Sequence, residues 1–316
     1  MTSTNPLSAI IEKQGRVILD GGLATALEER GHNLDDPLWS ARLLIEKPES
    51  IHQVHVDYLK AGADCITTSS YQASLQGFSA RGLDEADGHK LLRLSTTLAI
   101  EARDSFWSRP ENRQGRLCPL VAASIGPYGA YLTDGSEYNG AYSIDDDSLY
   151  EFHRDRWQVL ASSPADLLAC ETLPSLREAR VLLQLLQETP GRWAWVSFSC
   201  RDGLHLSDGT PFVDAVQTCS TAPGVAAVGI NCTAPQFISS LIEQARGATD
   251  LPVIVYPNSG EVYSPVSKRW HSASDTTAWI DDAARWHDLG ASGIGGCCRV
   301  GPRTITELRH RLLPGW

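Results

Sequence analysis

Short apolar segments alternate with amphipathic segments along almost the whole chain. The apolar runs predict eight strands, at residues 16–19, 64–68, 117–124, 166–169, 193–198, 225–230, 253–256 and 291–294. Between these runs apolar side chains recur at helical spacing, and Leu91, Leu94 and Leu98 share one face of residues 85–107. Strands that alternate with helices form parallel sheets, and eight such units favour a closed (β/α)8 barrel.

The remaining helices are expected in the intervals between the apolar runs. They are predicted at residues 24–30, 50–61, 147–160, 175–187, 211–219, 235–246, 275–287 and 303–313, with Ser50 as the N-cap of the second of these. No Ser-, Pro- or Gly-rich linker divides the units, so residues 1–316 are expected to form a single domain. An open, doubly wound sheet is the alternative, but Gly21 and Gly22 lack the third spaced glycine of a dinucleotide-binding turn.

One long segment without a regular pattern, residues 126–142, interrupts the alternation. It is rich in glycine and tyrosine, with Tyr128, Tyr131, Tyr138 and Tyr142 along its length. A loop of this length inside a compact domain is usually functional or disordered, and its aromatic side chains favour an ordered functional role.

Length and charge narrow the class of protein. The chain has 316 residues, which is normal for one α/β barrel of about 250 residues plus insertions. The net charge of −11 makes nucleic acid and anionic membranes poor partners. Residues 1–15 lack the pattern of a secretory signal, and no apolar run approaches the roughly 20 residues of a membrane span. We therefore expect a soluble cytoplasmic protein that acts on small molecules.

Three cysteines follow predicted strands. Cys232 comes directly after the sixth strand, and Cys297 and Cys298 follow a Gly-Gly pair after the eighth. The carboxyl ends of barrel strands meet at one mouth, where the glycines would let the backbone leave strand geometry. Three thiolates converging there would suit one Zn²⁺ with an open coordination position. Alternatives are a vicinal disulfide or plain burial, and burial is the interpretation for Cys65, Cys118, Cys170, Cys200 and Cys219.

A thiolate-rich zinc site favours a particular chemistry. Three thiolates leave zinc a weak Lewis acid for water but suit it to bind an incoming thiol, which would lose its proton and become a nucleophile. The expected reaction is alkyl transfer to sulfur. Asp20 and Glu171, also at strand ends, are candidate acceptors for the ammonium group of an amino-acid thiol, and Ser69 for its carboxylate. Asp20 could instead serve a turn, and Glu171 a helix first turn.

Two other classes of function compete with this interpretation. A zinc-stabilised binding or scaffold protein would need a fourth protein ligand to close the site. A redox protein would use Cys297 and Cys298 as a dithiol and show thiol reactivity without metal.

The chain also resembles the homocysteine S-methyltransferases, in particular the S-methylmethionine-dependent branch. The matching stretches are residues 19–25, 61–64, 69–74, 126–131, 134–138, 171–172, 207–209, 229–232, 256–261 and 295–299. The resemblance implies a (β/α)8 barrel with one zinc held by Cys232, Cys297 and Cys298, which act in methylation of homocysteine to methionine.

The resemblance also implies residues that bind the substrates and a choice of methyl donor. The substrate-binding residues would be Asp20, Gly21, Ser69, Glu171, Asn231, Tyr128, Asp134 and Glu137, with the last two and the tyrosines on the donor side. We expect S-methylmethionine as the first donor and S-adenosylmethionine as the second. The betaine-using relatives carry a C-terminal extension used in oligomerisation, whereas this chain ends after its last helix, so a monomer and a small homo-oligomer are both open.

Overall fold

Eight parallel strands form the centre of the computed structural model, which describes residues 4–34, 36, 38–260, 262–264, 269–271 and 278–315. They are β1 (Val17–Ile18), β2 (Cys65–Thr67), β3 (Leu120–Ile125), β4 (Leu167–Leu173), β5 (Ala194–Phe198), β6 (Val225–Asn231), β7 (Val253–Tyr256) and β10 (Ala291–Ile294). Their hydrogen-bonded order is β1-β10-β7-β6-β5-β4-β3-β2. All eight runs predicted from the sequence are therefore strands of one sheet.

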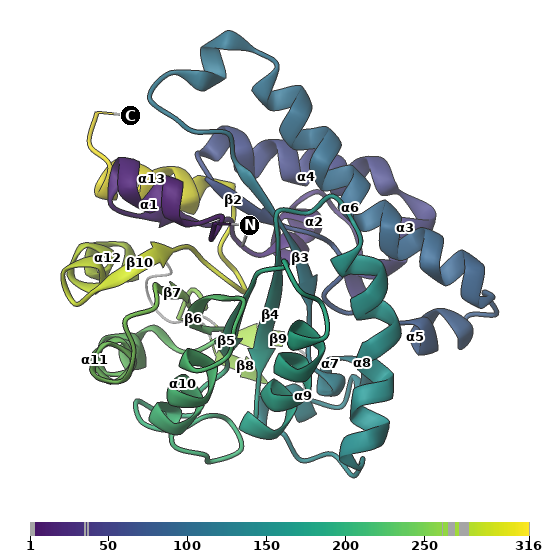
Figure 1. The fold of residues 1–316 in the computed structure, drawn as a ribbon. Coiled ribbons are helices and arrows are strands. Elements are labelled where there is room, and N and C mark those ends of the chain that lie inside the picture. The colour runs from purple at the N-terminus through teal and green to yellow at the C-terminus, as the bar shows by residue number, and fades with distance from the viewer. Residues whose placement is uncertain are drawn as a thin grey trace.

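Backbone hydrogen bonds join the first and last strands of this order. The Asp64 amide donates to the Ile18 carbonyl at 2.7 Å and the Asp20 amide to the Cys65 carbonyl at 3.1 Å, and Leu19 and Cys65 form a parallel bridge. The sheet thus closes on itself, which confirms the (β/α)8 barrel and leaves the open-sheet alternative without support. Figure 1 shows the helices surrounding these central strands.

The helices that follow the barrel strands lie close to the predicted positions. They are α2 (Leu23–Glu29), α4 (Pro48–Ala61), α6 (Glu85–Trp107), α8 (Asp146–Ala161), α9 (Leu176–Gln187), α10 (Phe212–Ser220), α11 (Ile238–Ala248), α12 (Ala278–Asp288) and α13 (Pro302–Leu312). Residues 275–277 of the predicted helix 275–287 lie outside the described residues, as does Glu261 of one matching stretch. Among the described residues, no helix has both the length and the apolar character that a membrane crossing requires.

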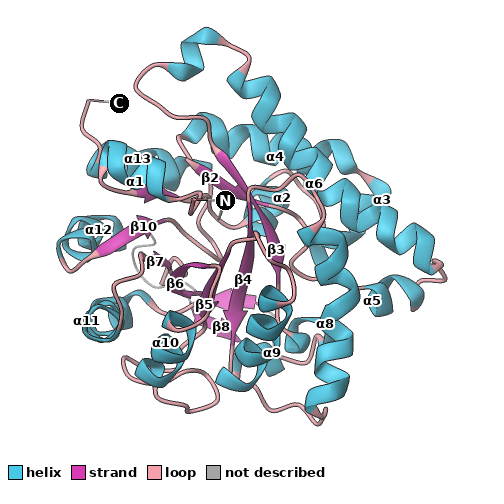
Figure 2. Cartoon of the chain, viewed as in Figure 1, coloured by secondary structure: helices cyan, strands magenta, loops and turns pink. Residues whose placement is uncertain are grey.

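Several short elements were not predicted. They are α1 (Ser8–Gln14), α3 (Leu43–Glu46), α5 (Leu75–Ser79), α7 (Tyr128–Leu132), the 3₁₀ turns η1 (Trp39–Arg42), η2 (Pro110–Arg113) and η3 (Ser136–Tyr138), and an antiparallel hairpin of β8 (Val262–Ser264) and β9 (Arg269–His271). The predicted helix 235–246 begins with a 3₁₀ turn, η4 (Pro235–Phe237), before α11. Figure 2 shows the helices in cyan and the loops and turns between them in pink. Ser50 is not an N-cap, because α4 already begins at Pro48, and proline suits a first helical position where no backbone donor is needed.

The barrel interior is filled by side chains that alternate along each strand. Val17 and Leu19 point into an inner apolar cluster, while Ile18 between them packs in the outer cluster beneath the helices. Helix α1 contributes Leu7 and Ile10 to the inner cluster at the end of the barrel where the strands begin. A cavity of about 680 Å³ lies at that same end, lined by residues that precede β1, β2 and β3 and by the C-terminal part of α13 with the residues after it. The chemistry-bearing residues are all at the opposite end.

Candidate metal centre and substrate site

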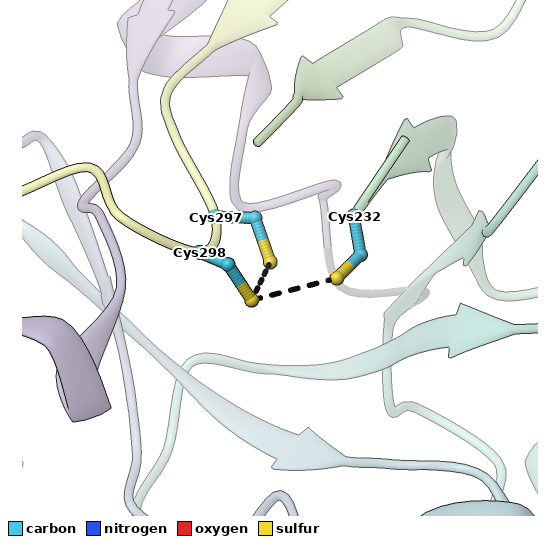
Figure 3. A group of neighbouring side chains, drawn as sticks. All are labelled: Cys232, Cys297 and Cys298. Carbon is cyan, nitrogen blue, oxygen red and sulfur yellow. Dashed lines mark hydrogen bonds between the residues drawn. The ribbon is translucent and has the colours of Figure 1, made fainter. Parts of the chain in front are cut away.

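Three cysteine sulfurs converge where β6 and β10 end (Figure 3). The Sγ atoms of Cys232 and Cys298 are 3.7 Å apart, those of Cys297 and Cys298 are 4.0 Å apart, and all three lie within 4.8 Å of one another. Tetrahedral zinc with sulfur bonds of about 2.3 Å would hold two sulfurs about 3.8 Å apart. The cluster therefore has the spacing of a three-thiolate zinc site, and among the described residues no His, Asp or Glu joins it as a fourth ligand.

The backbone that carries the cysteines is fixed by hydrogen bonds to the last residue of β7 and to the residue after it. The Cys232 amide donates to the Tyr256 carbonyl at 3.2 Å, and the Cys297 amide donates to the Pro257 carbonyl at 2.8 Å. Cys232 itself has a φ of +49°, a left-handed conformation that is uncommon for a residue with a side chain. The end of β7, which lies between β6 and β10 in the sheet, thus connects the segments that carry Cys232 and Cys297.

The Gly295-Gly296 pair serves close packing rather than an unusual dihedral angle. Neither glycine has a positive φ. A Cβ on Gly295 would lie 2.6 Å from the Leu19 Cβ, and a Cβ on Gly296 would lie 2.1 Å from a Val300 Cγ. Both distances are shorter than real carbon contacts allow, so only glycine lets the chain pass β1 and turn into the two cysteines.

Without a metal the three thiols cannot all ionise easily. Hydrogen bonds from Cys297 and Cys298 lower the pKa of Cys232, with a smaller contribution from the Tyr138 hydroxyl. The same sharing with Cys232 raises the pKa values of Cys297 and Cys298. The three sulfurs compete for ionisation in one small group, and a divalent cation would supply the positive charge that three thiolates need.

Asp20 and Glu171 are buried carboxylic acids beside this centre. Asp20 is 7% exposed and accepts from the Thr67 amide at 2.7 Å, and Glu171 is 8% exposed and accepts from the Ser124 hydroxyl. Burial raises the pKa of Asp20 to about 8 and that of Glu171 to about 7, and the charges of Glu171 and Cys297 respectively add to these increases. No ion pair among the described residues joins either acid to a basic side chain. A cationic ligand group would stabilise both ionised forms.

Ser69 has a side-chain hydroxyl that a substrate could use, whereas Gly21 has only its backbone. Ser69 is 1% exposed, and its hydroxyl is buried without a hydrogen-bond partner, so it has a donor available. At Gly21 a Cβ would lie 2.3 Å from the Val300 carbonyl oxygen and 2.9 Å from the Tyr58 hydroxyl. The side-chain position of Gly21 is thus occupied by protein atoms, and only its backbone could serve a ligand.

Asn231 uses its side chain inside the protein. Its Oδ1 accepts from the Thr172 amide at 2.8 Å and from the Ser197 hydroxyl at 2.8 Å, while its Nδ2 donates to the Thr172 hydroxyl at 2.7 Å. Thr172 has a φ of +60°. Asn231 therefore holds a left-handed residue next to Glu171, and this contact fixes the position from which the Glu171 carboxyl enters the site.

The predicted donor-side residues are separated by the folding of the 126–142 loop. The Tyr128 ring packs against Tyr142 and Phe152, with centroids 5.3 Å and 4.8 Å away. Asp134 is exposed and accepts from the Ser136 amide at 2.9 Å. Glu137 instead faces the interior, where its Oε2 is buried without a partner and its charge acts on Cys232.

Tyr138, one of the four loop tyrosines expected on the donor side, reaches the metal centre. Its hydroxyl lies 3.7 Å from the Cys232 sulfur. The sequence marked Tyr138 only as one of several aromatic residues in the loop, and no spacing rule connects it with a cysteine nearly one hundred positions away.

The other five cysteines were all expected to be buried. Cys118 is exposed instead, whereas Cys65, Cys170, Cys200 and Cys219 are buried as expected.

Comparison with known proteins identifies the family. Residues 17–312 match the family profile described as homocysteine S-methyltransferase. The homocysteine S-methyltransferase YbgG of Bacillus subtilis is 53% identical over 304 residues, covering 96% of each chain, and the homocysteine S-methyltransferase of Escherichia coli is 49% identical over 312 residues, covering 98% of this chain and all of the relative.

A solved structure agrees with the sequence comparison. The metallated form of the homocysteine methyltransferase MmuM from Escherichia coli superposes with a TM-score of 0.88 at 46% identity, over 97% of this chain and 100% of that one. On the strength of these matches, the chain belongs to the homocysteine S-methyltransferase family.

Proposed function

We propose that this protein transfers a methyl group from a sulfonium donor to the sulfur of L-homocysteine and so forms methionine. The observation that carries the proposal is the convergence of three cysteine sulfurs at zinc-compatible spacing with no fourth protein ligand among the described residues. A closed structural zinc site would need that fourth ligand. The family and the relatives' names support homocysteine as the methyl acceptor.

Cys232, Cys297 and Cys298 would hold one Zn²⁺. Zinc bound there would offer its remaining position to the substrate thiol and lower the pKa of that thiol, so that it is held as a thiolate at neutral pH. Asp20 and Glu171 would pair with the ammonium group of homocysteine, and the Ser69 hydroxyl would donate to its carboxylate. Burial raises the pKa values of both acids, and the ammonium group would supply the positive charge that stabilises their ionised forms.

The transfer itself needs no proton. The bond between the donor sulfur and its methyl carbon breaks, the electron pair stays on that sulfur, and a neutral thioether leaves. The new carbon–sulfur bond uses an electron pair of the homocysteine thiolate. Asp20 and Glu171 therefore orient and neutralise charge rather than act as acid or base, and exclusion of water strengthens the attraction between thiolate and sulfonium.

Glu137 and Tyr138 are the best candidates for the donor side. The partnerless Glu137 carboxylate oxygen could pair with the donor's own ammonium group, and the Tyr138 ring could face the sulfonium, a contact of about 0.5–2 kcal/mol. Tyr128 and Asp134 stay predictions, since their contacts in the protein involve other loop residues. The resemblance of residues 126–131 and 134–138 to the S-methylmethionine-dependent branch favours S-methylmethionine over S-adenosylmethionine.

The donor is tested by turnover of homocysteine with S-methylmethionine, S-adenosylmethionine and betaine at matched concentrations. We expect methionine from S-methylmethionine first and S-adenosylmethionine second. Glu137→Gln should raise the KM for the sulfonium and leave the zinc content unchanged. Efficient methionine formation from betaine, with none from either sulfonium, would contradict the assignment.

The domain organisation, the partners and the location of the protein belong to the same proposal. We infer one domain over residues 1–316, small-molecule substrates as partners, and a cytoplasmic location. The barrel strands, drawn from residues 17–294, support one domain. The net charge of −11 argues against nucleic acid and anionic membranes as partners. A monomer and a small homo-oligomer both fit these features.

A further inference from the structure

Both ends of the 126–142 loop are fastened to one buried carboxylate, that of Glu178. Glu178 lies on α9 and is 0% exposed. Its Oε1 accepts from the backbone amide of Tyr128 at 2.6 Å, and its Oε2 accepts from the Tyr142 hydroxyl. A carboxylate removed from water is stable only when its lone pairs are satisfied, so this one strongly favours the conformation that brings the two ends of the loop together.

A histidine and an arginine on α8 complete the cluster. His153 Nε2 is 2.8 Å from Glu178 Oε1, and Arg156 Nη2 is 2.8 Å from His153 Nδ1. Because arginine can only donate, Nδ1 must accept and the Nε2–H must donate to Glu178. Burial, with the charge of Arg156, lowers the pKa of His153 to about 4, so the imidazole is neutral at pH 7. The Arg156 guanidinium also donates to the Gly126 carbonyl, where the loop begins.

Between these fastened ends lies the turn that faces the metal centre. Glu137 and Tyr138 are on η3, and the Tyr138 hydroxyl is 3.7 Å from the Cys232 sulfur. The first arm of the loop packs tightly against this turn, because a Cβ on Gly129 would lie 2.4 Å from the Glu137 amide nitrogen. The place of the Glu137 carboxylate is therefore set by how the two ends of the loop are held.

We propose that Glu178 is a positioning residue for the methyl donor. It acts through the loop: by holding Tyr128 and Tyr142 it presents Glu137 and Tyr138 to the sulfonium beside the zinc-binding cysteines. Under the proposed function the charged partners of homocysteine are Asp20 and Glu171, near the ends of barrel strands and outside this loop, so we expect its affinity to depend little on how the loop is held. This inference rests on the proposed function, and it predicts that loosening the cluster affects one substrate only.

The test is Glu178→Gln in the full-length zinc-loaded enzyme. Glutamine has the same size as glutamate, but its amide nitrogen would face one of the groups that donate a hydrogen bond to the Glu178 carboxylate. That hydrogen bond would be lost. We expect the KM for S-methylmethionine to rise about tenfold or more, the effect of losing a hydrogen bond to a charged group. The affinity for homocysteine and the zinc content should not change. Tyr142→Phe removes only the bond at the far end and should shift the same KM by less.

A matched control is available at the opposite end of the barrel. Asp64 is 2% exposed and accepts from Arg309 at 2.8 Å and from the Ile18 amide at 3.1 Å, so it too is a buried carboxylate in a polar cluster. Asp64→Asn should lower the melting temperature without raising the KM for the donor. An equal KM increase in that variant, or equal increases for both substrates in Glu178→Gln, would reduce Glu178 to general stability and overturn the proposal.

Amide hydrogen exchange tests the positioning role of Glu178 independently of the methyl-transfer activity. Amides of residues 128–142 should exchange faster in Glu178→Gln and in Tyr142→Phe than in the wild type, whatever the methyl donor is. Unchanged exchange in both variants would overturn the positioning role. A wild-type protein that makes no methionine from any sulfonium would instead refute the proposed function, with the exchange result still valid for the loop.

Discussion

Replacement of Glu171 by glutamine should change substrate binding and stability in opposite directions. Glu171 is 8% exposed and accepts a hydrogen bond from the Ser124 hydroxyl, which the glutamine carbonyl can still accept. The substitution therefore removes the charge and keeps the size of the side chain, with the Tyr256 hydroxyl as its second polar neighbour. If that charge serves the homocysteine ammonium group, its loss weakens binding, while the substrate-free protein no longer has to bury a carboxylate.

The magnitudes follow from the burial of Glu171. Losing a charged hydrogen-bond partner costs about 1.5–3 kcal/mol, which corresponds to an affinity for homocysteine about 10- to 150-fold weaker. Burial raises the pKa of Glu171 from 4.5 to about 7. The ionised group therefore destabilises the native state progressively as the pH rises from about 4.5 through 7, by on the order of 3 kcal/mol at pH 8. Glutamine carries no such penalty.

The assay pairs calorimetric binding of homocysteine with thermal unfolding of the substrate-free zinc protein at pH 5 and pH 8. Glu171→Gln should bind homocysteine at least tenfold more weakly, keep its zinc, and gain melting temperature relative to the wild type at pH 8 but not at pH 5. Glu188→Gln, which removes an exposed carboxylate at the end of α9, should change neither quantity. Wild-type affinity in Glu171→Gln, or loss of its zinc with an intact fold, would refute the reasoning.

Two further predictions concern the cysteine turn and proton release. Gly296→Ala places a Cβ 2.1 Å from a Val300 Cγ, so the turn must shift, and we expect a loss of about 1–3 kcal/mol in stability together with weaker zinc binding in a chelator competition. Gly247→Ala, where the new Cβ meets nothing within 4 Å, should leave zinc binding unchanged, and equal zinc affinities for the two variants would argue against the packing role. Homocysteine binding at pH 7 should release more than one proton, since the thiol loses one and Asp20 and Glu171, with pKa values of about 8 and 7, must ionise to pair with the ammonium group. Titration in two buffers of different ionisation enthalpy measures this number, and a release of one proton or fewer would contradict the pairing.

The sequence was sufficient for the barrel and for the position of the metal centre. Each barrel strand corresponds to a short apolar run in the sequence. Parallel strands place all their carboxyl ends at the same mouth of the barrel. Cys232 and Cys297 could therefore be brought together from their positions after strands, without knowing a single contact. The same rule located Asp20, two residues after β1, and Glu171, although β4 extends past Glu171 to Leu173.

The remaining features depend on packing that no local pattern encodes. Asn231 follows the same rule as Cys232, yet its amide is used to hold Thr172 in a left-handed conformation. The loop that brings Tyr138 to the cysteines is hydrogen-bonded at Tyr128 to a buried carboxylate on α9, far along the sequence. Gly296 was expected to relax the backbone dihedral angles, but its lack of a side chain is needed to clear Val300.

The measurement that tests the account most directly is X-ray absorption at the zinc K-edge, with and without homocysteine. We predict one zinc per chain bound by three sulfurs at about 2.3 Å and one lighter ligand, changing to four sulfurs when homocysteine is added. Cys298→Ser should lose the zinc and the methyl-transfer activity together. A sulfur count that does not rise with homocysteine, or a Cys298→Ser variant with a full equivalent of zinc and normal turnover, would contradict it.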